Sequence, residues 1–192
     1  MEALLAAAVL KDVEQIRQKA PLVLNVTNYV AMDLTANALL SLGASPIMAH
    51  APEELEELVQ ISGAVVLNMG TLDSAWAESI RFAARAAEQN NKPVVFDPVG
   101  VGASRFRTQF AVSLLKEFPL RCVRGNASEI LALYGGEKTA KGVDSTSSPE
   151  SVVRWLKQQG KTRETIAMSG AVDFILSDTA TAKLSNGSPR ID

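Results

Sequence analysis

Two charged residues of this sequence have the type and surroundings that metal and phosphate chemistry requires. Asp97 ends a short apolar run and is followed by a turn rich in proline and glycine at 98–102. A carboxylate there can reach Mg²⁺, which proteins usually hold with one or two carboxylates plus substrate phosphates. Capping of the turn or of the next helix is the alternative role. Arg124 follows a later run, and its guanidinium either matches phosphate oxygens or forms a surface ion pair.

Other side chains at the ends of apolar runs extend this set of candidates. Glu129 lies in the first turn of a predicted helix, either as a second carboxylate near the same cation or as a capping partner. Ser169, followed by Gly170, lets a phosphate approach the backbone or forms an ordinary turn. Met48 lines an apolar ring pocket or fills a gap in the core. His50, the single histidine, is either structural or an acid–base group.

An alternation of short apolar runs with amphipathic segments must position these residues. The predicted strands are 21–24, 45–48, 64–69, 93–96, 121–123 and 165–168, with helices between them and a closing hairpin of 174–176 and 181–184. Such βαβ units predict a mainly parallel sheet covered by helices on both faces.

In a parallel sheet the strands deliver their carboxyl ends to one edge, where open α/β proteins bind ligands. We therefore predict that Asp97, Arg124 and Ser169 share one rim beside a small-ring pocket near Met48. The residues that follow the predicted strands form the candidate rim: Asn25, Thr27, Asn28, Met48, Asn68, Gly70, Asp97, Arg124, Gly125, Asn126, Ser169 and Gly170.

Composition excludes several classes of protein. The 192 residues are 47% hydrophobic and 21% charged, with a net charge of -2; this favours one globular domain spanning 1–192 and excludes a disordered chain. The absence of a basic block predicts no nucleic-acid partner. Cys122, the only cysteine, cannot form an internal disulfide, and no zinc-ligand spacing occurs. The apolar stretch 3–10 lacks a basic start and is too short to span a bilayer, so we expect a helix, no membrane partner and a cytoplasmic protein.

Taken in order, the rim motifs resemble those of one known family. The chain is similar to hydroxyethylthiazole kinases, ribokinase-like enzymes of thiamine salvage, over essentially its whole length. The resemblance rests on the segments at 27–28, 35–37, 43–48, 68–72, 97–99, 124–129, 142–144 and 169–173.

The resemblance implies transfer of the γ-phosphoryl group of ATP to the hydroxyl of 4-methyl-5-(2-hydroxyethyl)thiazole, with Mg²⁺. It also implies a homotrimer with sites between subunits. By position, the thiazole would lie at Met48, Asn28, Val30 and Gly70. Arg124 and Ser169 would contact ATP, and Asp97 and Glu129 would hold the metal environment.

One family motif does not occur in these 192 residues. The family's Gly-x-Gly-Cys segment, which supplies an anion hole and the presumed base, is absent, and Cys122 lies in a predicted strand. We therefore expect a ribokinase-like three-layer α/β/α fold without its C-terminal part, and a chain with no appreciable kinase activity by itself. Two alternatives remain: a catalytically dead thiazole-binding or oligomerisation module, or a related enzyme such as a nicotinamide-nucleotide-hydrate dehydratase.

Overall fold

The computed structural model describes residues 2–139, 148–160 and 162–185, so the motif at 142–144 lies outside the described residues. Helices and strands alternate along the chain, as the sequence predicts. In order they are α1 (Glu2–Lys19), β1 (Leu22–Val26), α2 (Met32–Leu42), β2 (Ser45–Met48), α3 (Pro52–Ile61), β3 (Ala64–Asn68), α4 (Ser74–Gln89), β4 (Val94–Asp97), α5 (Arg105–Glu117), β5 (Cys122–Asn126), α6 (Ala127–Thr139), α7 (Pro149–Gln159), β6 (Thr165–Ser169), β7 (Asp173–Leu176) and β8 (Thr181–Leu184).

These strands form one sheet of eight, in the order β2-β1-β3-β4-β5-β6-β7-β8. Neighbouring strands are parallel from β2 to β6, and the last two pairs are antiparallel. The predicted parallel sheet and the closing hairpin are therefore confirmed. The carboxyl ends of β1 to β6 meet at one edge of the sheet.

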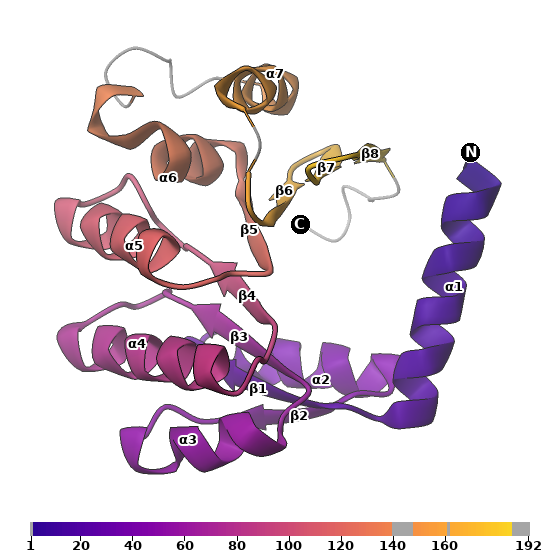
Figure 1. Cartoon of the computed structure of the whole chain (residues 1–192), viewed down its shortest axis with the longest axis vertical. Helices are drawn as coiled ribbons and strands as arrows, with labels where there is room; N and C mark the ends of the chain where they lie inside the picture. The colour runs from indigo at the N-terminus through magenta and orange to yellow at the C-terminus, as the bar shows by residue number, and fades with distance from the viewer. Residues whose placement is uncertain (1, 140–147, 161, 186–192) are drawn as a thin grey trace.

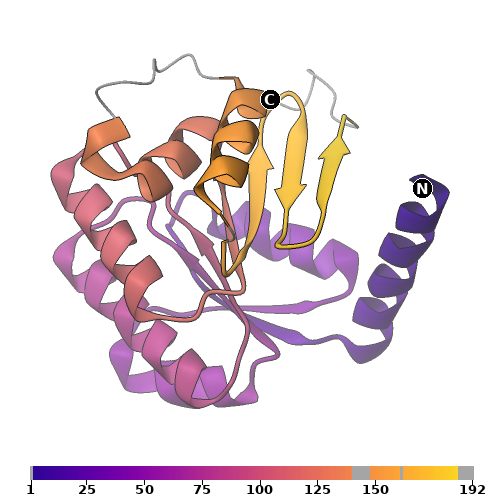
Figure 2. The ribbon, with the colours of Figure 1, turned by 45° about the horizontal axis from the view of Figure 1, so that its top comes forward.

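Helices α3 to α7 cover one face of the sheet, while α2 lies on the other face (Figures 1 and 2). The main core lies under the first group, where Leu67, Phe96 and Ile166 are fully buried. On the opposite face, Val66 and Val95 are only half-buried. The prediction of helices on both faces of the sheet is therefore confirmed, although the described helices cover the second face incompletely. In the part of the chain that the structure describes, no helix combines the length and the apolar character needed to cross a membrane.

Local sequence signals start several of these helices. Pro52 occupies the first turn of α3, where its missing N–H costs nothing. The side chains of Asp73 and Ser104 accept backbone N–H groups at the starts of α4 and α5.

Helix α2 has an unusual environment for an apolar helix. It contains no buried residue. Four apolar residues spaced four apart, which we call the α2 stripe, are all exposed, and Leu34 among them is 76% exposed: Val30, Leu34, Ala38 and Leu42. The α2 stripe therefore faces away from the core of its own chain.

Candidate active site

A chain of polar side chains crosses the carboxyl ends of four strands. Asn68 and Asp97 lie opposite each other in β3 and β4. The Asn28 Nδ2 donates to Asn68 Oδ1 at 2.8 Å, and Asn68 Nδ2 donates to Asp97 Oδ2 at 2.9 Å. The Arg124 Nη1 lies 3.4 Å from the same Asp97 oxygen. These bonds join a residue that follows β1 to residues of β3, β4 and β5. We call Asn28, Asn68, Asp97 and Arg124 the rim network.

Gly70 fits closely against this network. Its backbone N–H donates to Asn68 Oδ1 at 2.8 Å. A Cβ at this position would lie 2.5 Å from Asn28 Nδ2 and 3.0 Å from Asn68 Oδ1. A side chain here would therefore displace the amides, which explains why the sequence has glycine at this point of the loop.

Asp97 is the carboxylate best placed to hold a cation. Burial raises its pKa above the ordinary value and nearby Glu129 adds to that, whereas Arg124 and the hydrogen bond from Asn68 oppose the rise. Its Oδ1 is buried and has no hydrogen-bond partner among the described residues. A buried carboxylate oxygen without a partner is costly, and a hard cation is the ligand that suits it. The site therefore fits Mg²⁺.

Glu129 contacts two backbone amides rather than pointing freely into the site. Its Oε1 accepts the N–H of Gly100 and its Oε2 accepts the N–H of Asn126, both at 2.9 Å. Asn126 Oδ1 in turn accepts the N–H of Glu129 at 2.9 Å. This reciprocal arrangement is a capping box at the start of α6. The capping role is thus present in the structure, and a direct role at a cation stays a prediction.

The remaining predicted residues occupy the same edge of the sheet at different depths. Met48 ends β2 and Ser169 ends β6, where Ser169 pairs with Asn126. Arg124 lies inside β5, because that strand continues through Asn126 alongside β6. The Val30 side chain is 85% exposed, so contacts within this chain do not bring it into the network.

Asn25 corrects the predicted rim. We expected it after the first strand, but β1 extends to Val26 and buries Asn25 completely. Its Nδ2 donates to the Val23 carbonyl at 2.8 Å, so the side chain satisfies part of its hydrogen bonding within the strand.

His50 belongs to an aromatic cluster beside the network. Its ring stacks on Trp76 at 5.1 Å between centroids, and Tyr29 contacts both rings. The Trp76 Nε1 donates to the carbonyl of Asn68 at 3.2 Å. The histidine therefore packs against a ring that supports Asn68.

The structure gives two residues of the site a role that the sequence did not predict. Asn68 is the centre of the rim network, although the sequence marked it only as one polar residue after a strand. Arg107, from the first turn of α5, donates from Nη1 to the carbonyls of Met69 and Val99, both at 2.8 Å. No sequence signal singled it out.

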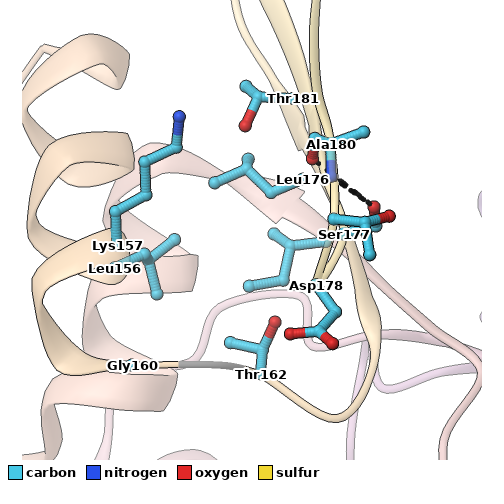
Figure 3. A pocket seen from close by; sticks show the side chains of 11 residues that line it. Leu156, Lys157, Gly160, Thr162, Leu176, Ser177, Asp178, Ala180 and Thr181 are labelled. Carbon is cyan, nitrogen blue, oxygen red and sulfur yellow. Dashed lines mark hydrogen bonds between the residues drawn. The ribbon is translucent and has the colours of Figure 1, made fainter.

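A cavity of about 550 Å³ lies elsewhere, between α7 and the hairpin of β7 and β8. Figure 3 shows Lys157 of α7 on one side and Asp178 and Thr181 on the other. Its lining includes none of the rim network, so it does not contribute to the candidate site.

Comparisons with known proteins agree with the observed fold. A ribokinase-like superfamily protein from Enterococcus faecalis superposes with a TM-score of 0.54 at 12% identity, covering 88% of this chain and 63% of that one. Hydroxyethylthiazole kinase from Pyrococcus horikoshii superposes with a TM-score of 0.80 at 40% identity, covering 96% of this chain and 69% of that one. The predicted ribokinase-like α/β class is confirmed.

The sequence comparisons are more specific than the fold. The profile of the Hydroxyethylthiazole kinase family matches residues 13–191. Hydroxyethylthiazole kinase from Leptospira biflexa is 50% identical over 179 residues, 93% of this chain and 67% of that protein. This chain therefore belongs to the hydroxyethylthiazole kinase family, and it spans about two thirds of that relative.

Proposed function

We propose that the rim network serves ATP-dependent phosphorylation of the hydroxyl of 4-methyl-5-(2-hydroxyethyl)thiazole, as the names of the relatives suggest, within thiamine salvage. The hydroxyl oxygen forms a bond to the γ-phosphorus, and the bond from that phosphorus to the bridging oxygen of ADP breaks. The observation that carries the proposal is the Asp97 Oδ1, which is buried beside Arg124 and has no hydrogen-bond partner in the part of the chain that the structure describes. Family membership favours this reaction over a dehydratase.

Phosphoryl transfer depends on positioning and on charge stabilisation. Bound Mg²⁺ would neutralise phosphate charge, and Asp97 Oδ1 is the oxygen that would hold it, with Glu129 adding negative charge nearby. The Arg124 side chain is half exposed and can turn from Asp97 to phosphate oxygens. Ser169, on the neighbouring strand, would contact ATP beside it.

The thiazole alcohol would bind on the β1 and β2 side of the rim. Asn28 is held there by its hydrogen bond to Asn68, Gly70 packs closely against both amides, and Met48 offers an apolar surface. The Val30 side chain contributes only if another molecule covers it. Other exposed apolar side chains of this segment and of α2 belong to Tyr29, Leu34 and Leu40. Because such patches commonly mark interfaces, we propose a homotrimer with sites between subunits.

We further propose that these 192 residues alone have no appreciable kinase activity. Cys122, the one cysteine, is half-buried in β5, and burial raises the pKa of its thiol. A thiol with a raised pKa stays protonated near neutral pH and cannot accept a proton, so the sequence offers no substitute for the family's Cys motif. Losing an anion-hole donor typically costs about 10²–10³ in rate.

Calorimetry and a phosphorylation assay test the proposal together. Purified protein should bind both the thiazole alcohol and Mg²⁺–ATP. It should form the phosphate ester at least about a hundredfold more slowly than the Pyrococcus horikoshii relative. Failure to bind the thiazole alcohol would refute the proposed function. Turnover equal to that of the relative would refute only the proposed loss of activity, and binding with no product at all would identify a thiazole-binding module. The predicted cytoplasmic location stays a prediction.

A further inference from the structure

Arg107 links two loops of the candidate site. Its Nη1 donates to the carbonyl of Met69, in the loop after β3, and to that of Val99, in the loop after β4, both at 2.8 Å. One loop carries Gly70, and the other follows Asp97 directly. The side chain is half-buried, and a Cβ on Gly100 would touch its Cδ at 3.4 Å. The aliphatic part of the Arg107 side chain therefore packs against the loop after β4.

Glu129 continues this linkage to the next strand. It accepts the N–H of Gly100 and the N–H of Asn126, so it joins the loop after β4 to the end of β5. Arg107 and Glu129 thus connect three consecutive strand ends through backbone groups. The rim network joins the same strands through side chains, so the loops are held from two sides.

The bonds of Arg107 are stronger than ordinary loop contacts. Hydrogen bonds from a charged donor are roughly twice as strong as those between neutral groups. Met69 is fully buried, so its carbonyl would lose a partner that water cannot readily replace. Loops at strand ends are otherwise the most mobile parts of an α/β fold.

We infer that Arg107 is a positioning residue, which aligns the Gly70 loop with the Asp97 turn so that the acceptor alcohol and the metal-bound phosphate meet in register. This inference rests on the proposed function for its ligands, but the alignment of the two loops is a property of the apo protein. Arg107 itself need not touch either substrate.

Amide hydrogen exchange in the full 192-residue protein tests the alignment without any ligand. In Arg107→Ala, the amides of Gly70 and Gly100 should exchange about tenfold faster, because both loops lose a charged hydrogen bond. Amides of β1 should be unchanged. Arg107→Lys keeps a cation with several donors and should give an intermediate rate. The matched control is Arg105→Ala. Arg105 is exposed in the same helical turn, and its side chain makes no hydrogen bond or ion pair with the described residues.

Calorimetry with the thiazole alcohol supplies the second readout. Its dissociation constant should rise about tenfold in Arg107→Ala and stay within twofold in Arg105→Ala. Exchange at Gly70 and Gly100 equal to that in the Arg105 control would overturn the inference. So would exchange that rises equally throughout the sheet, since that indicates a merely structural role. If wild-type protein binds no thiazole alcohol, the proposed function fails, and the exchange rates alone then decide whether Arg107 aligns the loops.

Discussion

At the scale of single residues, the candidate site depends on a carboxylate that the fold holds at a cost. Asp97 is mostly buried, its pKa is raised, and one of its oxygens has no partner among the described residues. Structural positions rarely keep such a group, because burial of a charge without compensation destabilises the folded state. Strained or destabilised groups are instead common at functional sites.

Replacing this carboxylate should separate stability from binding. Because the pKa of Asp97 is raised in the folded state, the folded protein binds the proton more tightly than the unfolded chain does. Wild-type stability therefore falls as the pH rises from the ordinary value of 3.8 through the raised one. Asp97→Asn should melt at the same temperature or higher at pH ~7, with the difference shrinking below about pH 4.

Melting curves over this pH range, with and without Mg²⁺–ATP, check the prediction. The nucleotide should raise the melting temperature of the wild type but not that of Asp97→Asn. A variant that is less stable at neutral pH and still responds to Mg²⁺–ATP would contradict the role assigned to Asp97.

Gly70 is the second residue at which a small change should have a large effect. Gly70→Ala puts a methyl group 2.5 Å from Asn28 Nδ2, so the bond from Asn28 to Asn68 must lengthen. We expect binding of the thiazole alcohol to weaken by about tenfold or more, while the melting temperature changes little. Calorimetry measures the first and differential scanning fluorimetry the second. Gly63→Ala is the matched control, since a Cβ there would meet only ordinary van der Waals neighbours, the nearest at 3.4 Å.

At the scale of elements, side chains at the starts of helices hold neighbouring loops together. The α6 cap is built by Asn126 and Glu129, and the second oxygen of Glu129 extends it to Gly100. The loop that follows Asp97 is thereby attached to the helix that follows Arg124. A capping interaction that would be local in an isolated helix becomes a tertiary contact here.

Glu129→Gln tests this contact with a substituent of the same shape. The amide retains one acceptor, but its NH₂ group faces one of the two backbone N–H donors, which is left unsatisfied. Urea denaturation should show a loss of roughly 1–2 kcal/mol. Glu57→Gln, on the exposed side of α3, should change the free energy of unfolding by less than about 0.5 kcal/mol. Equal effects of the two substitutions would show that the two bonds to Glu129 do not stabilise the fold.

At the scale of the whole molecule, one sheet runs through all the described strands, while the single domain spanning 1–192 stays a prediction. Its two faces differ. The face under α3 to α7 is closely packed. On the other face lies α2 (Figure 2), which exposes the apolar side chains of Leu34, Leu40 and Leu42. An apolar helix that buries nothing in its own chain is explained if a second copy packs on it.

Leu34→Glu should therefore dissociate the assembly without unfolding the protomer. Leu34 is 76% exposed, so the charge is hydrated in the monomer and costly only at an interface. Ile61→Glu is the control, because Ile61 is 68% exposed and belongs to α3, which covers the face of the sheet opposite to α2. Sedimentation velocity should show a trimer for the wild type and Ile61→Glu, and a monomer for Leu34→Glu. A monomeric wild type would refute the proposed interface.

The sequence by itself determined the alternation of strands and helices, and hence a parallel sheet with Asp97, Arg124 and Ser169 at one edge. The spacing of apolar residues and the residue types at turns are local properties, so they can be read from neighbouring residues. Family motifs added the chemistry of the rim. The sequence could not show that β1 extends past Asn25, since the length of a strand depends on its partners β2 and β3.

Only the tertiary structure decided how the site is held. Arg107 reaches Met69 across 38 positions of the chain and Glu129 reaches Gly100 across 29, and no local pattern encodes which carbonyl or amide lies within reach of a folded side chain. The same holds for the exposed α2 stripe. An apolar period shows that a helix face is to be covered, but only the packing of the molecule shows that its own core does not cover it.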